Sequence, residues 1–251
     1  MLFEERTLYA AVAIVGGLLT AVFVAWARRF DGATRRHAML APAITASLTV
    51  SYVGMATGVL LLRGPHGAPV YLTRFLDYGV VYAVMIAYTG QLADADRRSV
   101  LSGILGLWAF SFGAMARHLA SPPLDSLASL LVLGGFVYSL WLLLRTYTRA
   151  AASVAGDRRL LFGKLRNVQV IMLLTYLLVA LTTRQALGLL GAFTGIYVSA
   201  YLDLFSHVAL AGLLLRSEPA IRSTVETHPS PLSFLTRSNT DHPTAETPAD
   251  D

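Results

Sequence analysis

The chain has 251 residues, of which 55% are hydrophobic and only 14% are charged, whereas soluble domains carry about 25% charged residues. The formal net charge is +5 at pH 7, and the mean hydropathy is +0.58. These values place the chain in the membrane-protein class. The absence of cysteine excludes disulfides, thiolate catalysis and cysteine metal sites.

Seven apolar blocks are long enough to cross a bilayer core of about 30 Å, which takes about 20 helical residues. In chain order, the expected spans are Leu8–Ala27, Ala38–Leu62, Val70–Leu92, Ser99–Ala116, Leu124–Leu144, Val168–Thr183 and Leu187–Leu215. Each is expected to be a helix, because backbone polar groups in lipid must be paired within the segment. The predicted fold class is an all-α membrane protein, a seven-transmembrane-helix bundle in which sequence neighbours pack antiparallel.

Basic residues gather at alternate ends of these spans. One set of ends carries fourteen of them, namely Arg28, Arg29, Arg35, Arg36, Arg97, Arg98, Arg145, Arg149, Arg158, Arg159, Lys164, Arg166, Arg216 and Arg222. The opposite set carries five, namely Arg6, Arg63, Arg74, Arg117 and Arg184. The positive-inside rule therefore predicts a multi-pass protein of the cell membrane, with its N-terminus outside and its C-terminus in the cytoplasm.

The apolar pattern stops at Arg216. Residues 1–216 are expected to form one transmembrane domain, and residues 217–251 a disordered cytoplasmic tail rich in Ser, Thr, Pro and Asp. The basic face of the domain suits anionic lipid headgroups, so the predicted partner is the lipid bilayer and not nucleic acid.

A row of small residues on the first span leaves a second kind of partner open. Ala13, Gly17, Ala21 and Ala25 recur every fourth residue, a spacing that permits close helix approach. The row either packs inside the bundle or forms a contact face for a homo-oligomer or another membrane protein.

Four ionisable side chains lie well inside the expected spans: Arg74, Asp77, Asp203 and His207. Each charge there costs roughly 2.5–3.5 kcal/mol on insertion scales, so it should face the bundle interior and find a partner. Within each helix the two residues are three or four apart and share a face, which predicts one buried cluster. The cluster is either a functional site or a polar contact that fixes helix register. The two acids favour a charged imidazole and burial opposes it, so both states of His207 stay open.

At these residues the chain resembles the microbial (type I) rhodopsins, in detail the haloarchaeal bacteriorhodopsin-like branch. The third span has Arg74-Phe-Leu-Asp77-Tyr78, similar to R-Y-A-D-W, and the sixth has Arg166-Asn167-Val168 followed by Tyr176, similar to R-N-V-x(7)-Y. The seventh has Asp203-Leu-Phe-Ser-His207 and Leu213-Leu-Leu-Arg216-Ser217, similar to D-x-x-x-K and L-L-R-S, and the second has Ala41-Pro42-Ala43-Ile44, similar to a P-A-I element.

The resemblance implies a retinal pocket between the third, sixth and seventh helices. Arg74 matches the family's extracellular-side arginine, and Asp77 and Asp203 match its two counterion carboxylates. Tyr176 matches a pocket tyrosine that hydrogen-bonds the second carboxylate.

The departures from the family pattern are equally informative. His207 stands where the family has its Schiff-base lysine, and an imidazole has no primary amine with which to form an imine. The only lysine is Lys164, at the cytoplasmic end of the sixth span. Tyr88 stands at the position of a cytoplasmic proton donor, and a phenol with an ordinary pKa of about 10 is a poor proton relay.

The expected pocket is also poorer in tryptophan than the family pattern, and it lacks a kink-forming proline and a hydroxyl residue. Its lining is expected to comprise Tyr78, Val81, Leu173, Tyr176, Leu177 and Ala180.

The predicted function is that of an opsin-related protein without a covalent cofactor, acting as a light-independent binding, signalling or assembly module. One alternative is an ion or proton conductor, against which a largely apolar cytoplasmic half argues. Another is a rhodopsin that binds retinal or another apocarotenoid non-covalently in the central pocket. The sequence contains no visible nucleophile–base or metal constellation, so an enzyme is not expected.

Overall fold

A computed structural model of the chain describes residues 2–65, 67–182, 187–231 and 233. Its α-helices are α1 (Leu2–Ala27), α2 (Gly32–Ala38), α3 (Leu40–Thr57), α4 (Leu72–Leu92), α5 (Arg97–Leu119), α6 (Leu124–Trp141), α7 (Tyr147–Ala150), α8 (Gly156–Thr182), α9 (Ala192–Leu215) and α10 (Glu218–Thr227). A π-helical turn, η1 (Leu142–Thr146), and a 3₁₀ turn, η2 (Ala151–Ser153), flank α7. Thr183, Arg184 and tail residues 234–251 lie outside the described residues.

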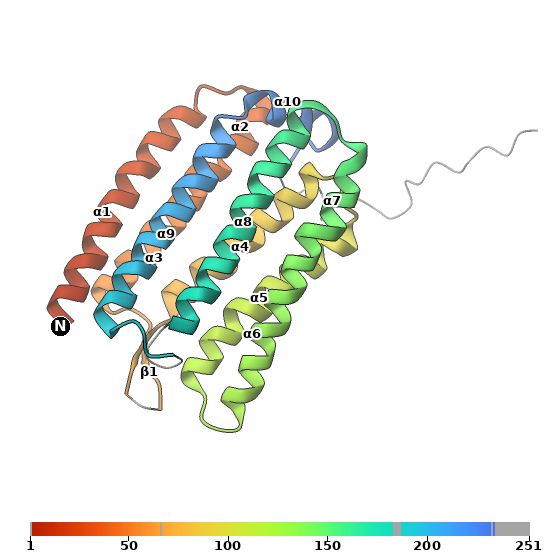
Figure 1. Cartoon of the computed structure of the whole chain (residues 1–251). Helices are drawn as coiled ribbons and strands as arrows, with labels where there is room; N and C mark the ends of the chain where they lie inside the picture. The colour runs from red at the N-terminus through yellow and green to blue at the C-terminus, as the bar shows by residue number, and fades with distance from the viewer. Residues whose placement is uncertain (1, 66, 183–186, 232, 234–251) are drawn as a thin grey trace, which may run out of the picture.

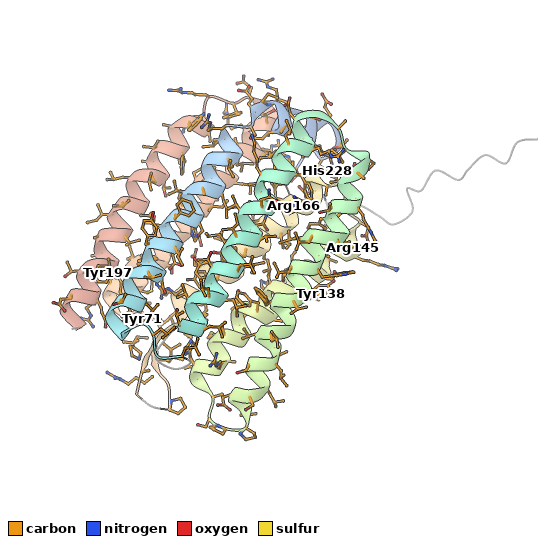
Figure 2. All side chains as sticks on the ribbon, in the orientation of Figure 1. Tyr71, Tyr138, Arg145, Arg166, Tyr197 and His228 are labelled. Atoms are coloured by element: carbon orange, nitrogen blue, oxygen red, sulfur yellow. The ribbon has the colours of Figure 1, made fainter. Side chains whose placement is uncertain are left out.

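The long helices lie side by side in one bundle, with α2 and α10 at one end and a short hairpin at the other (Figure 1). Arg166 and His228 lie toward the first of these ends, and Tyr71 and Tyr197 toward the second (Figure 2). The first is called the arginine-rich end below, because the spans place most of their basic residues there. The positive-inside rule assigns this end to the cytoplasm.

Six segments among the described residues are long and apolar enough to cross a membrane: Glu4–Ala27, Gly32–Thr57, Arg97–Leu119, Leu124–Ser153, Gly156–Thr182 and Thr194–Leu215. The remaining long helix is α4, which carries Arg74, Asp77 and Gln91. Most of its residues from Gly79 onward are buried, so this part of α4 is largely covered by protein. The predicted seven-helix bundle is therefore confirmed, with the helix that carries Arg74 and Asp77 largely enclosed by the others.

The second expected span does not continue to Leu62. Gly58 takes the left-handed conformation, with φ of 76°, and ends α3. The chain then forms β1 (Leu61–Arg63), which pairs antiparallel with β2 (Pro69–Tyr71) before α4 begins. In this hairpin Leu61 lies opposite Tyr71, so apolar residues expected inside a helix instead cover the end of the bundle.

Two other spans are longer than expected. The fifth runs past Leu144 through η1, α7 and η2. The sixth begins at Gly156 rather than Val168, because Leu161, Phe162 and Leu165 are buried on the inner face of α8. Exposed basic residues such as Arg159 lower the mean hydropathy of this stretch, so the sequence does not show that the helix begins at Gly156.

The expectation of a disordered tail is wrong for Glu218–Thr227. This stretch forms α10, which packs against α8 and α2 and buries Ala220, Ile221 and Thr224. These three side chains fall on one helical face, and that spacing gives a short amphipathic helix even in a polar composition.

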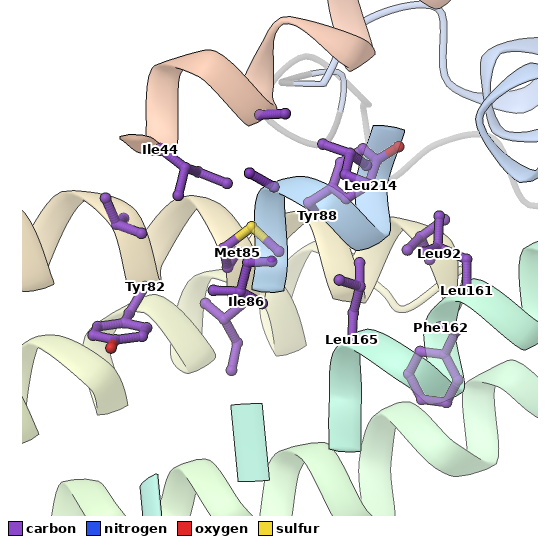
Figure 3. Close-up of a cluster of buried hydrophobic side chains, with 14 of the residues drawn as sticks. Ile44, Tyr82, Met85, Ile86, Tyr88, Leu92, Leu161, Phe162, Leu165 and Leu214 are labelled. Carbon is purple, nitrogen blue, oxygen red and sulfur yellow. The ribbon is translucent and has the colours of Figure 1, made fainter. Parts of the chain in front are cut away.

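An apolar layer fills the half of the bundle that lies toward the arginine-rich end. Ile44 from α3, Met85 and Ile86 from α4, Leu165 from α8 and Leu214 from α9 are each at most 2% exposed. Figure 3 shows these side chains converging between the four helices. The layer holds α4 at the centre of the bundle.

Helices α5 and α6 approach closely at Gly135. A Cβ atom at that position would lie 2.5 Å from the backbone nitrogen of Phe110 and 2.6 Å from the carbonyl oxygen of Gly106. A Cβ at the adjacent Gly134 would meet nothing within 4 Å. Only Gly135 is therefore required for the close approach of the two helices, although Gly134 is its neighbour in sequence.

We predict that Gly135→Ala lowers the free energy of unfolding by about 1–3 kcal/mol, because the added methyl group forces the helices apart. Gly134→Ala is the matched control and should be neutral or stabilising by up to about 1 kcal/mol, through helix propensity alone. Thermal unfolding of both variants in detergent tests this. Equal effects at the two positions would show that α5 and α6 do not pack in this register.

Candidate functional site

The structure brings together the four ionisable residues of the expected cluster. Arg74 and Asp77 lie on α4, and Asp203 and His207 lie on α9. Nη2 of Arg74 is 3.2 Å from Oδ2 of Asp203. Nε2 of His207 is 3.1 Å from Oδ2 of Asp77. The cluster therefore consists of two oppositely directed pairs that join α4 to α9.

The Asp203 carboxylate is surrounded by donors. The hydroxyls of Tyr78 and Tyr176 donate to its Oδ1 at 2.5 and 2.6 Å. The Tyr52 hydroxyl donates to Oδ2 at 2.6 Å, beside the Arg74 guanidinium. Three hydroxyl donors and one ion pair thus surround an ionised carboxylate that has roughly four lone-pair sites. Asp203 is thus held by groups from α3, α4 and α8, which fixes α9 against all three helices.

The His207 ring is oriented from its own helix. Nδ1 lies 2.6 Å from the carbonyl oxygen of Asp203, and a carbonyl only accepts, so Nδ1 carries a hydrogen. Nε2 faces Asp77 at ion-pair distance, without the alignment of a hydrogen bond. A bare Nε2 and a bare carboxylate would both present lone pairs, so one proton belongs to the pair. The Ser47 hydroxyl donates to the other oxygen of Asp77 at 2.6 Å.

The cluster is buried and electrically neutral. Asp203 and His207 side chains are 1% and 0% exposed, Asp77 is 3% exposed and Arg74 is 18% exposed. Arg74 balances Asp203, and a charged imidazole at His207 would balance Asp77 in the same way. A neutral sum is what the interior of a membrane protein requires.

The expected pocket-lining residues divide into two groups. Tyr78, Tyr176, Leu177 and Ala180 line a cavity of about 140 Å³ between α4, α5, α6 and α8. The other two, Val81 and Leu173, are buried in the hydrophobic core. The roles of all six toward a ligand stay predictions.

The expectation of a largely apolar cytoplasmic half needs correction. Tyr88 is 1% exposed, and its ring lies 5.7 Å from the ring of His37 on α2. Nearby, Nε2 of Gln169 donates to Oγ1 of Thr89 at 2.6 Å. His37 precedes the expected second span. The Gln169 amide and the Thr89 hydroxyl lie in predominantly apolar spans, so neither stands out in the sequence. This half therefore contains buried polar side chains.

Sequence reasoning missed Tyr52 and Ser47, which hold the two carboxylates. Both lie on α3 and are uncharged, so a search for ionisable residues passes over them. The spacing of Ser47 and Ser51 was the available signal for Ser47, because it places two hydroxyls on one face of an otherwise apolar span.

The sequence profile described as "Bacteriorhodopsin-like protein" matches residues 4–220. The chain belongs to this family. It is 28% identical over 223 residues to bacteriorhodopsin-I of Haloarcula marismortui, across 84% of this chain and 88% of that protein. It is also 28% identical over 232 residues to sensory rhodopsin-2 of Haloarcula vallismortis, across 90% and 96%. The resemblance drawn from the motifs is thus confirmed at family level.

Solved structures confirm the fold. Thermophilic rhodopsin from Rubrobacter xylanophilus matches with a TM-score of 0.80 at 20% identity, across 88% of this chain and 99% of that chain. Halorhodopsin, a light-driven chloride pump, matches with a TM-score of 0.76 at 21% identity, across 88% and 97%. The chain is a multi-pass protein of the cell membrane with a rhodopsin-type bundle, and none of the relatives named here is described as an enzyme.

We predict that Asp203→Asn lowers the free energy of unfolding by about 3–5 kcal/mol, because Arg74 loses its buried counter-charge. Asp125→Asn is the control: Asp125 is a partly exposed acid in the first turn of α6, and its loss should cost about 0.3–1 kcal/mol. Chemical denaturation in mixed micelles measures both. If Asp203→Asn were no worse than Asp125→Asn, Asp203 would not anchor the cluster.

Proposed function

We propose that this chain is an opsin-related membrane protein that holds no covalent retinal and acts as a light-independent binding, signalling or assembly module. The observation that carries the proposal is the contact between His207 and Asp77. In the family, as the resemblance implies, Asp77 balances the positive Schiff base formed on a lysine. Here the residue at the lysine position is an imidazole that lies 3.1 Å from the same carboxylate.

The residues of the site do not fit a covalently attached retinal. Imine formation needs a primary amine, which the imidazole of His207 does not supply. The only lysine, Lys164, is exposed on α8 twelve residues before Tyr176, the α8 residue that contacts Asp203. Twelve helical residues span about 18 Å, which is beyond the reach of a lysine side chain from the level of the cluster.

A non-covalent retinal is one alternative, and the size of the cavity lined by the expected pocket residues argues against binding at that place. Sites that enclose drug-sized ligands measure roughly 300–1,000 Å³. The cavity lined by Tyr78, Tyr176, Leu177 and Ala180 measures about 140 Å³. Neither Asp77 nor His207 is among its lining residues, so a molecule bound there would not contact this pair.

Ion or proton conduction is the other alternative, and the apolar layer of Figure 3 argues against it. Asp77 and Tyr88 are eleven residues apart on α4, a rise of about 16 Å. Ile44, Met85 and Ile86 fill part of this interval and are at most 2% exposed. A proton leaving the central pair would find no polar group among these three side chains.

Reconstitution with all-trans retinal tests the proposal. The purified native chain should stay colourless after washing, because no amine faces Asp77. His207→Lys should gain a visible absorbance band, since it restores the amine beside a retained carboxylate. His207→Gln is the matched control: it removes the imidazole without adding an amine, and it should stay colourless.

A washed native chain with a visible band would contradict the proposal. Borohydride reduction followed by peptide mass spectrometry would then locate the adduct. A band in the native chain that borohydride does not fix would instead support the non-covalent alternative. If His207→Lys also stays colourless while folding normally, the small cavity excludes retinal as well.

A further inference from the structure

The C-terminal segment from Glu218 to Pro231 folds back onto the arginine-rich end of the bundle. Its helix α10 packs against α8 and α2, with Ala220, Ile221 and Thr224 at most 1% exposed. Figure 1 shows α10 beside α2 across this end. The outer face carries an exposed pair between Arg222 and Glu218. Residues 218–231 are called the cap below.

Arg158 of α8 joins the cap to the end of α4. Its side chain is 6% exposed, and it donates to the carbonyl oxygens of Gln91 at 2.6 Å and Leu92 at 3.0 Å. These carbonyls belong to the last turn of α4, where the partial negative charge of the helix end favours a positive side chain. The same guanidinium donates to the Thr227 hydroxyl of the cap at 3.1 Å and lies 3.1 Å from Asp94.

Asp94 connects Arg158 to the cap a second time. Its Oδ1 accepts from Nε2 of His228 at 3.0 Å. This hydrogen bond is the largest influence that lowers the pKa of Asp94 from 3.8 to about 2; partial burial opposes it and the Arg158 charge adds to it. Asp94 also has φ of 58°, a conformation rare for residues other than glycine. Arg158, Asp94 and His228 are called the latch below.

The cap covers polar groups that belong to the interior. The Gln91 side chain donates to the carbonyl oxygen of Pro231 at 2.6 Å. Pro231 and Ser230 line one side of a cavity whose other wall includes Tyr88. The Tyr88 hydroxyl is buried without a hydrogen-bond partner among the described residues, and His37 lies against the backbone of His228 in the cap. The cap therefore covers polar side chains of the bundle as well as apolar ones.

We propose that the cap is a regulatory contact: it closes the arginine-rich end of the bundle over Tyr88 and His37, and it opens as a unit when the latch is released. This inference is separate from the proposed function, because no residue of the central cluster takes part in the latch.

The contacts support opening as a unit rather than gradual fraying. The side chains of His228 and Arg158 are 5% and 6% exposed, so each loses buried partners when the other moves. The latch ties together α8, the loop after α4 and the segment after α10, and a change in any one of them alters the other two. Such linked contacts give an element two discrete positions.

Thiol labelling can test the cap directly, because the native chain has no cysteine. Thr224→Cys places a thiol on the inner face of α10, where the native side chain is 0% exposed. Its reaction with a water-soluble maleimide in detergent reports opening of the cap. Ser139→Cys, buried on α6 at 0% exposure, reports unfolding of the bundle in parallel.

His228→Ala and Asp94→Asn should each raise the labelling rate of Thr224→Cys at least tenfold. Arg222→Ala is the matched control: it removes an arginine from the outer face of α10 without touching the latch, and it should change the rate less than twofold. Ser139→Cys should stay unlabelled in all of these backgrounds.

Three results would overturn the proposal. The first is an unchanged labelling rate in both latch variants. The second is fast labelling of Thr224→Cys with the latch intact, which would mean that the cap does not close. The third is parallel labelling of Ser139→Cys, which would mean that the latch residues support the whole bundle rather than a separate cap.

Discussion

The structure depends on the neutralisation of buried charge between α4 and α9. Water is not available inside a membrane to solvate Arg74, Asp77 and Asp203, so each must meet its partner within the bundle. This requirement places the charged side chains of α4 inside the bundle and turns the polar face of α9 toward them. It also explains why tyrosine hydroxyls from α3, α4 and α8 converge on Asp203. The apolar layer beside the cluster then packs around a helix whose position is already set.

The same requirement explains how a rhodopsin-type bundle accommodates His207. Asp77 would be an isolated buried carboxylate if nothing positive or protonated faced it. The imidazole faces this carboxylate at 3.1 Å and is oriented by a carbonyl of its own helix. Under the proposed function, the carboxylates are retained without a covalent chromophore because a protein side chain occupies the place of the charge that they balance. The arginine-rich end follows the same rule on a smaller scale, where Asp94 lies between Arg158 and His228.

The sequence predicted the parts of this structure that are governed by bilayer thickness and charge. Seven spans and the facing pairs on α4 and α9 follow from apolar length and from residue spacing. Tyr52 could not be found in that way, because an uncharged hydroxyl gives no sign of its partner 151 positions away. The cap was missed for a different reason: α10 is short, and the polar composition of the whole tail conceals its apolar face. The observed span ends differ from the predicted ones for two reasons. A left-handed glycine ends the helix early at Gly58, and exposed arginine such as Arg159 lowers the local hydropathy.

The central claim is that Asp77 and His207 stabilise each other as a buried pair. A double-mutant cycle with Asp77→Asn, His207→Gln and the combined variant measures that coupling directly, from free energies of unfolding in detergent. The two single changes should each destabilise the protein, and the combined change should cost clearly less than their sum, with a coupling energy of about 1–3 kcal/mol. Additivity within about 0.5 kcal/mol would contradict the account, because the two side chains would then be buried near each other without interacting.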